Sequence, residues 1–413
     1  MYLATIDRSA GGARGNRKFV AVGANVVALG TVSLVTDVSS EMVTAVLPVY
    51  LILALHLGPA GYGVIDGLYT GATALLRPVG GYVADRIRRR KLIAGIGYAL
   101  SAGAKLGLVV AASSVPAISA TIVVDRAGKG LRTAPRDALI TLSAAEGSLG
   151  RAFGVHRAMD SAGAFAGPLV ALAVLAASGQ AFDAVFVTSS CLAAIGVLLL
   201  ILFVSDRRGP GPAAGVVSPR AVVGLLSLRG VRLVGIGAVL LGLSTIGDGF
   251  IYLLLQRREN LAIGWFPVLA VGTSLAYLLL AVPFGALADR VGRTPVYLGG
   301  YAGLLATYLL LAAPWRGWPV LAVILGLYGG FYAATDGVLM ALAGPLLPAE
   351  LRTSGLALVQ TGQALAYLVS SVLFGLAWQW WGVGTAIRVA AVAAAAGFAV
   401  TATVLVRGKL AVR

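Results

Sequence analysis

Long apolar stretches separated by short basic segments run through the whole chain and limit what it can fold into. A stretch of about 20 apolar residues crosses the hydrocarbon core of a bilayer as a helix, and 59% of this chain is hydrophobic while only 12% is charged. In lipid a backbone has to satisfy its hydrogen bonds internally, which leaves helices as the economical solution for such segments. We therefore predict an all-α polytopic membrane protein.

Charged residues, Pro and Gly divide the apolar stretches into twelve expected transmembrane helices, six in each half of the chain. The spans of the first half are expected at 19–55, 62–84, 91–112, 116–136, 151–178 and 184–205. Those of the second half are expected at 232–255, 262–287, 295–313, 317–344, 352–380 and 384–406. The predicted domains are an N-terminal segment 1–18, a six-helix bundle 19–205, a linker 206–231, a second six-helix bundle 232–406 and a tail 407–413.

The basic residues indicate how the helices are oriented. The net charge is +16, but the Lys and Arg residues fall in clusters between the spans and not in one patch, so we do not expect nucleic-acid binding. Nearly all loop cations lie on one side of the expected bundle, and the exceptions are Arg257, Arg258 and Arg316. Because cytoplasmic loops are enriched in Lys and Arg, we expect both termini in the cytoplasm and the protein in the inner membrane.

The two halves also resemble each other in sequence. The segment "GYVADRIRRR" at 81–90 matches "GALADRVGRT" at 285–294, and each lies between the second and third spans of its half. Two six-helix units in the same orientation form a parallel repeat, which is typical of secondary transporters with a binding site near the bilayer midplane. Along essentially its whole length the chain resembles the major facilitator superfamily, a resemblance that implies two bundles related by a pseudo-two-fold axis.

The repeated loop segment is similar to the loop motif of that superfamily. A carboxylate at a helix end accepts hydrogen bonds from a neighbouring helix N-terminus or pairs with an arginine. The resemblance implies that the motif latches the outward-facing state, although the arginines alone would also serve to orient the helices. The predicted latch residues are Gly81, Asp85, Arg86 and Arg89 in the first copy, and Gly285, Asp289, Arg290 and Arg293 in the second.

Two acids interrupt the first apolar stretch. Asp37 and Glu41 lie in the middle of the span and share one helix face, because they are four residues apart. Like charges repel, and a low-dielectric setting favours the neutral form of a carboxyl group, so we expect one acid to be protonated. Acids inside membranes are costly and usually functional. We predict a proton site here, with a cation or amine site, or hydroxyl partners such as Ser39 and Ser40, as alternatives.

The fourth expected span carries a charged stripe. Asp125, Lys129, Arg132 and Arg136 recur at helical spacing in "VVDRAGKGLRTAPRDALI". Arg126 through Gly130 resembles a fourth-span motif that the superfamily associates with proton coupling, so Arg126 and Lys129 are expected as charge partners in a cavity. A basic cavity would equally suit an anionic substrate. Arg132 and Arg136 are expected to face lipid phosphates near the cytoplasmic end.

Further charged residues complete the candidate site. Asp248 and Asp336 fall in the seventh and tenth spans, which line the central cavity in the superfamily. The resemblance therefore includes both residues in the predicted proton or substrate site. Asp66, Arg77 and Lys105 are expected to pair among themselves. The predicted cytoplasmic gate consists of Arg132, Arg136, Asp137, His156, Arg157 and Asp160, with an ion pair expected between Arg157 and Asp160. Gly163 and Gly167 predict a closely packed fifth helix that resembles part of an exporter motif.

Other chemistries find little support in the sequence. The two histidines are far apart, and the lone Cys191 is expected to be a buried thiol. No phosphate-binding G-x-x-x-x-G-K-[ST] motif occurs, so ATP is not expected to drive the protein. We expect no metal, no cofactor and no enzymatic activity, and a monomer suffices for alternating access.

These features predict a secondary transporter of a small molecule, coupled to protons and working as an exporter by antiport. Uptake of an organic anion by proton symport is the first alternative, since the basic stripe would bind it. A non-transporting sensor or a lipid-handling protein on the same fold is the second alternative.

Overall fold

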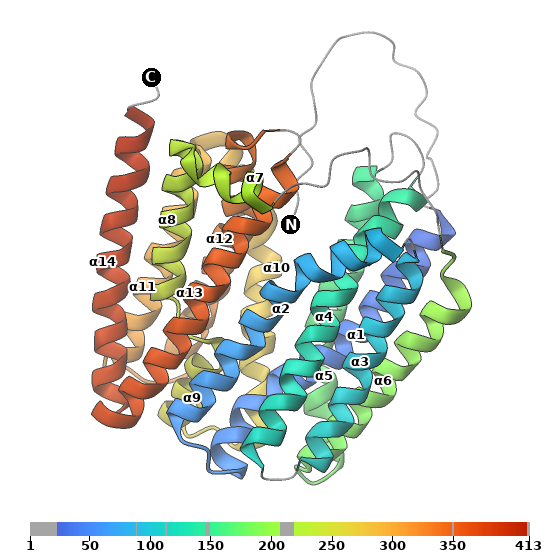
Figure 1. The fold of residues 1–413 in the computed structure, drawn as a ribbon. Coiled ribbons are helices and arrows are strands. Elements are labelled where there is room, and N and C mark those ends of the chain that lie inside the picture. Colours follow the sequence, from blue (N-terminus) through green and yellow to red (C-terminus); the bar gives the residue numbers. More distant parts are fainter. Residues whose placement is uncertain are drawn as a thin grey trace.

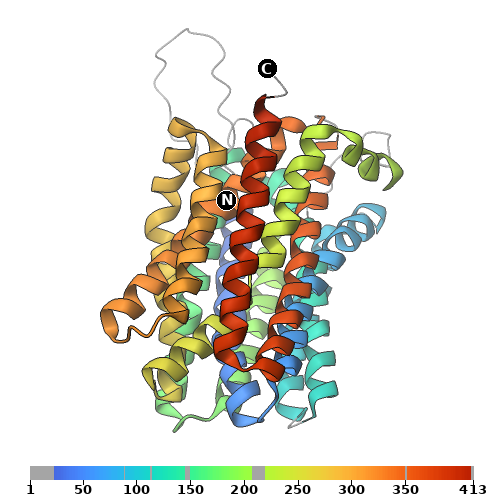
Figure 2. The same ribbon diagram turned by 90° about the vertical axis from the view of Figure 1, so that its left-hand side faces the viewer.

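A computed structural model describes residues 23–87, 89–111, 114–144, 149–206, 219–348 and 351–410. Its first half contains α1 (Ala24–Val49), α2 (Pro59–Ile87), α3 (Arg90–Val110), α4 (Val115–Ser143), α5 (Leu149–Ala177) and α6 (Phe182–Phe203). After the short α7 (Pro219–Gly224), the second half contains α8 (Arg229–Ser244), α9 (Asp248–Glu259), α10 (Phe266–Val291), α11 (Arg293–Ala312), α12 (Trp318–Ala343), α13 (Arg352–Trp381) and α14 (Val383–Leu410). The described part contains no β-strand, and its long helices stand side by side in two bundles (Figures 1 and 2).

The helices account for all twelve expected spans when α8 and α9 are taken as one. Ten of these segments are long and apolar enough to cross a membrane by composition alone. The remaining two, α2 and α4, carry charged side chains. In Figure 1 α4 stands upright among its neighbours, whereas α2 runs obliquely across the front and bends at its upper end. A helix buried among other helices does not need an apolar surface all round. The charge on α4 is therefore a property of its position and not a sign that it lies outside the membrane.

Helix packing repeats from one half to the other. In the first half α1 packs on α5 and α6, α4 packs on α2 and α3, and α3 packs on α6. The second half repeats each of these pairings, with α8 on α13 and α14, α12 on α10 and α11, and α11 on α14. Between the halves α2 packs on α13 and α5 on α10, which is the reciprocal pair that a two-fold axis requires. The repeat seen in the loop sequences thus extends to the whole architecture.

Two local features depart from the sequence-based expectation. The seventh span is not continuous, because α8 ends at Ser244 and α9 begins at Asp248. Asp248 is therefore the first residue of a helix and not a mid-helix side chain. Cys191 is exposed on α6, so the expectation of a buried thiol was wrong. In the first span Pro48 precedes a π-helical turn, Tyr50–Ala54, which ends the helix.

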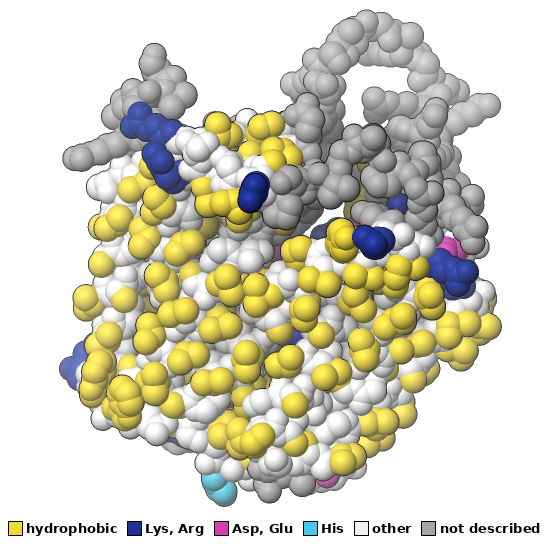
Figure 3. Space-filling model, viewed as in Figure 1, with side chains coloured by type: hydrophobic (Ala, Val, Ile, Leu, Met, Phe, Trp, Pro, Cys, Tyr) yellow, Lys and Arg dark blue, Asp and Glu magenta, His cyan; other side chains and the backbone are white. Residues whose placement is uncertain are grey.

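Contacts between the halves are concentrated at one end of the bundle. We call the end where α1 begins and α14 finishes the terminal face, and the opposite end the far face (Figure 1). At the far face the backbone N–H of Ala60 donates to Gln379 at 3.3 Å, and the rings of Tyr62 and Phe250 meet edge to face with centroids 4.7 Å apart. At the terminal face a hollow lies between the halves (Figure 3). The protein is closed at its far face and open at its terminal face.

Candidate functional site

The deepest charge cluster joins α3 to α4. Asp125 accepts hydrogen bonds from Arg126, with Nε at 2.9 Å, and from the hydroxyl group of Ser101. Lys105 Nζ lies 3.9 Å from the same carboxylate, and the side chains of Lys105 and Arg126 are only 2% and 3% exposed. The guanidinium group of Arg126 also stacks on the ring of Tyr69 at 3.8 Å. This carboxylate is fully committed to two buried cations.

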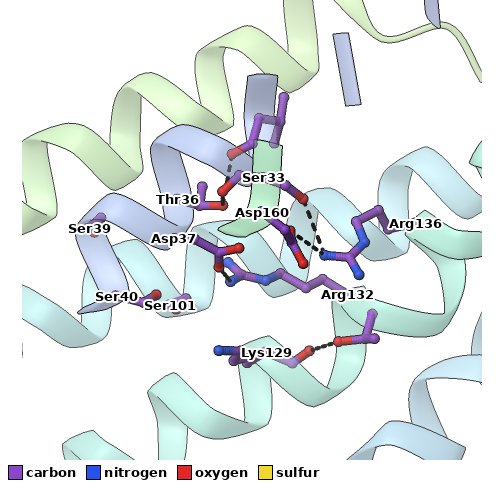
Figure 4. A network of polar contacts seen from close by, with 12 residues as sticks. Ser33, Thr36, Asp37, Ser39, Ser40, Ser101, Lys129, Arg132, Arg136 and Asp160 are labelled. Carbon is purple, nitrogen blue, oxygen red and sulfur yellow. Dashed lines mark hydrogen bonds and ion pairs between the residues drawn. The ribbon is translucent and has the colours of Figure 1, made fainter. Parts of the chain in front are cut away.

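Asp37 finds its partners on α4 and α5. Its Oδ1 lies 4.0 Å from Nη2 of Arg132, whose guanidinium stacks on Tyr98 at 4.3 Å. The carboxyl group of Asp160 on α5 lies close enough to interact with that of Asp37. Two ionised carboxylates so placed repel each other, so a proton on one of them stabilises the pair. Figure 4 shows this pair of acids between the guanidinium groups of Arg132 and Arg136.

Asp160 links this pair to the predicted gate. Its oxygens lie 3.7 Å from Nη1 of Arg136 and 3.4 Å from Nη1 of Arg157, which is the expected Arg157–Asp160 ion pair. Arg136 also pairs with Asp137 at 3.0 Å. The expectation that Arg132 and Arg136 face lipid phosphates was wrong, because both side chains are buried inside the N-terminal bundle.

A hydroxyl group joins the gate histidine to α1. Nη1 of Arg136 donates to Ser33 Oγ at 3.2 Å, and that oxygen lies 3.0 Å from Nε2 of His156. His156 is 1% exposed and pairs with Ser33, not with Asp160. Hydroxyl groups both donate and accept, so the chain Arg136–Ser33–His156 is a continuous polar path from α4 through α1 to α5.

Unlike the residues above, Glu41 and Lys129 do not belong to a close ion pair among the described residues. In the described part of the chain no carboxylate oxygen lies within 4.0 Å of Lys129 Nζ. Its charge nevertheless interacts with Asp37 and Glu41. Glu41 is brought to the cavity by the close approach of α5, since a Cβ on Gly167 would lie 2.6 Å from the Cβ of Glu41. The two side chains are partly exposed and available to a ligand.

The C-terminal half faces this cluster with one acid held by phenols. Oδ1 of Asp248 accepts hydrogen bonds from the hydroxyl groups of Tyr328 and Tyr332 on α12. The charges of Asp248 and Glu41 interact across the boundary between the halves. The wall opposite the charged stripe is therefore aromatic and rich in hydroxyl groups.

The remaining predicted residues lie apart from this centre. Asp336 is exposed, about 12 Å along α12 from Tyr328 at 1.5 Å per residue, and interacts with Tyr277 of α10. In the second loop motif Asp289 and Arg290 are exposed, and Arg293 donates to the carbonyl of Ala341 at 2.6 Å. In the first motif Arg86 donates to Tyr82 at 3.1 Å. The surroundings of Gly81 and Asp85 lie outside the described part.

Several site residues were not anticipated from the sequence. Tyr69 stacks on Arg126 and Tyr98 stacks on Arg132. Tyr328 and Tyr332 donate hydrogen bonds to Asp248. The four-residue spacing of Tyr328 and Tyr332 in an apolar helix was a usable signal, because buried tyrosines need a partner for the hydroxyl group. The expected pairing among Asp66, Arg77 and Lys105 was wrong. Lys105 pairs with Asp125, Arg77 donates to Gln360 and Asp66 accepts from Ser371.

Comparison with known proteins identifies the class. The sequence profile of the Major Facilitator Superfamily matches residues 29–262 and 236–410. An uncharacterised MFS-type transporter of Methanocaldococcus jannaschii is 31% identical over 361 residues, which cover 86% of this chain and 88% of that protein. The chain is a multi-pass membrane transporter. It belongs to the major facilitator superfamily.

More distant similarities agree with this assignment. The fosmidomycin resistance protein of Escherichia coli is 24% identical over 375 residues, covering 87% of this chain and 84% of that protein. Among solved structures, the nucleoside transporter NupG superposes with a TM-score of 0.76 at 14% identity, covering 92% of this chain and 98% of that chain. A POT family transporter in complex with 5-aminolevulinic acid gives 0.78 at 13% identity, covering 95% and 97%. At these identities the structures establish the fold alone.

Proposed function

We propose that the protein is a proton-coupled exporter of the inner membrane that exchanges a small molecule for protons. Its termini lie in the cytoplasm, so the hollow at the terminal face opens to the cytoplasm and receives the substrate. The asymmetric placement of loop cations in the sequence supports this orientation.

The observation that carries proton coupling is the pair Asp37–Asp160. The two carboxyl groups approach each other from helices α1 and α5, and their mutual repulsion favours binding of one proton to the pair. Arg132 and Arg136 lie beside them and favour release of that proton when the pair separates. A proton bound in one state of the bundle is then released in the other, which is what coupling requires.

Export is supported by the packing of α5 and by similarity. Gly163 approaches α1 so closely that a Cβ there would lie 2.4 Å from the carbonyl oxygen of Leu34, which accounts for the partial exporter motif. The E. coli relative is named as a resistance protein. The loop motifs form the latch in the opposite state, when the terminal ends of the two bundles come together. The exposure of Asp289 and the open terminal face in the present state support this role.

A second candidate function rests on Lys129. Among the described residues Lys129 has no ion-pair partner, and such an ammonium group is suited to an anionic substrate, whose uptake would proceed by proton symport. For this function Lys129, and not Glu41, would contact the substrate.

The test uses everted membrane vesicles with a fluorescent reporter of the pH gradient. Cationic, neutral and anionic compounds are added to wild type and to Asp37→Asn. Proton antiport predicts that at least one compound collapses the gradient in wild type and not in the variant. Symport predicts instead that only anions act and that their effect requires Lys129. No response to any compound would contradict proton-coupled export.

A further inference from the structure

A second pair of acids lies at the closed far face, across the boundary between the halves. Asp66 on α2 accepts hydrogen bonds from Tyr62, at 3.3 Å, and from Ser371 on α13. It sits against the break in the seventh span, since a Cβ on Gly247 would lie 2.1 Å from Oδ2 of Asp66. Asp248 is the next residue, so the two carboxyl groups approach each other from opposite halves and their charges interact.

The break in the seventh span is shaped to receive α2. A Cβ on Gly249 would lie 1.9 Å from the hydroxyl oxygen of Tyr62 and 2.6 Å from Pro48. Glycines at 247 and 249 thus allow Tyr62 and Asp66 to dock on the first turn of α9. Asp66 also lies against the N-terminus of that helix, and Asp248 stands within it. The docking is specific to the closed far face, because it exists only while α2 touches the second half.

Both carboxyl groups are surrounded by hydroxyl groups. Tyr62 and Ser371 donate to Asp66, and Tyr328 and Tyr332 donate to Asp248. The other titratable or charged groups near the two acids include Glu41, Tyr69, Tyr252, Tyr308 and Tyr367 and, with partners of their own, Arg77 and Arg126. Two ionised carboxylates in this setting repel each other, because no cation is paired with either among the described residues.

We propose that Asp66 and Asp248 form a proton-binding site that holds the far face shut. With a proton on the pair, one acid is neutral and the two halves pack as observed. Loss of the proton leaves two negative charges that repel each other across the boundary, and the halves separate there. This site differs from Asp37–Asp160, which lies within one half and whose coupling role the inference does not require.

The sign of the pH response follows from this arrangement. The closed far face binds one more proton than the open far face, so raising the pH favours opening. For one linked proton, the ratio of open to closed molecules rises by about tenfold per pH unit over the range in which the proton is lost. The effect levels off where both states are deprotonated or both are protonated.

The experiment measures the far-face distance by double electron–electron resonance over a pH series. Spin labels are attached through Val110→Cys and Gly384→Cys in a Cys191→Ser background, in lipid nanodiscs without substrate. Val110 is 84% exposed, and no atom lies within 4 Å of a Cβ on Gly384, so neither label disturbs packing. The parent is expected to shift from short to long distances as the pH rises. Asp66→Asn and Asp248→Asn are each expected to keep the short distance at every pH.

Matched variants show which acidic residues cause the pH dependence of the far-face distance. Asp183→Asn removes an exposed acid elsewhere at the far face and is expected to retain the parent's pH slope. Gly247→Ala, whose Cβ collides with Asp66, is expected to populate the long distance even at low pH. A flat parent, or a parent slope retained in both Asp66→Asn and Asp248→Asn, would overturn the inference. So would a slope abolished by Asp37→Asn alone, although coupling at Asp37 would then stand. A closed state that follows sodium at constant pH would also overturn it.

Discussion

The buried acids of the two halves of the bundle have different neighbouring groups. In the first half Asp125 lies beside the buried cations Arg126 and Lys105, whereas in the described part of the second half Asp248 accepts hydrogen bonds from tyrosine hydroxyl groups. A carboxylate beside a buried cation is held in its charged form, while one surrounded by hydroxyl groups is free to take up a proton. The same fold, repeated, thus holds Asp125 in a fixed ion pair in one half and leaves Asp248 switchable in the other.

The largest expected effect contrasts Asp125 with Asp248. Asp125→Asn leaves Arg126 and Lys105 as buried cations without a carboxylate, and removing one partner of such a pair costs about 3–5 kcal/mol. Asp248→Asn keeps an oxygen that accepts from the tyrosines and should change stability by about 1 kcal/mol or less. Thermal unfolding of both variants in detergent checks this. Equal losses would remove the contrast between the halves.

A smaller loss of stability is expected when the guanidinium group of Arg126 is replaced by another group of the same charge. Arg126→Lys loses the two-pronged contact with Asp125 and the stacking on Tyr69, which together should destabilise the protein by about 1–2 kcal/mol. The matched control is Arg290→Lys, because Arg290 is exposed at the end of α10. An Arg126→Lys protein as stable as this control would show that charge alone matters.

Tyr332→Phe sharpens the account of the second half. It removes one of two hydroxyl donors to the same oxygen of Asp248, so the expected cost is about 1 kcal/mol. Tyr82→Phe serves as a control, because its hydroxyl group contacts an exposed arginine at the helix end. Unfolding measurements on both variants test the difference, and an unchanged Tyr332→Phe would argue against a structural role for that hydrogen bond.

Glu41→Gln should have the smallest effect on stability. No ion pair or side-chain hydrogen bond constrains Glu41 among the described residues, so the change should stay within about 0.5 kcal/mol. Substrate binding should nevertheless weaken, because Glu41 interacts electrostatically with both Lys129 and Asp248. Binding of the compound selected in the vesicle assay is the measurement. Unaltered binding would place the substrate elsewhere in the cavity.

The sequence was sufficient for the class, the repeat and the charged face of α4. Helical periodicity places Asp125, Lys129, Arg132 and Arg136 on one stripe, because spacing along one helix is fixed. It does not place them against other helices, since rotation and depth depend on packing. Arg132, expected at the lipid headgroups, therefore turned out to be the partner of Asp37.

The far face shows the same limit more clearly. Asp66 and Asp248 are far apart in the sequence, and each sits in an apolar context that gives no hint of the other. Only the glycines flanking Asp248 signalled a close approach, and they did not say what approaches. Contacts between halves are long-range features of a fold, and a single helix pattern does not encode them.

The central claim is that Asp37, with Asp160, carries the coupled proton. It is tested most directly in proteoliposomes containing wild type, Asp37→Asn or the control Asp183→Asn, with proton flux and substrate exchange measured on the same preparations. The account predicts that Asp37→Asn still exchanges labelled substrate but moves no protons, while the control does both. Proton flux at the wild-type rate in Asp37→Asn would contradict it.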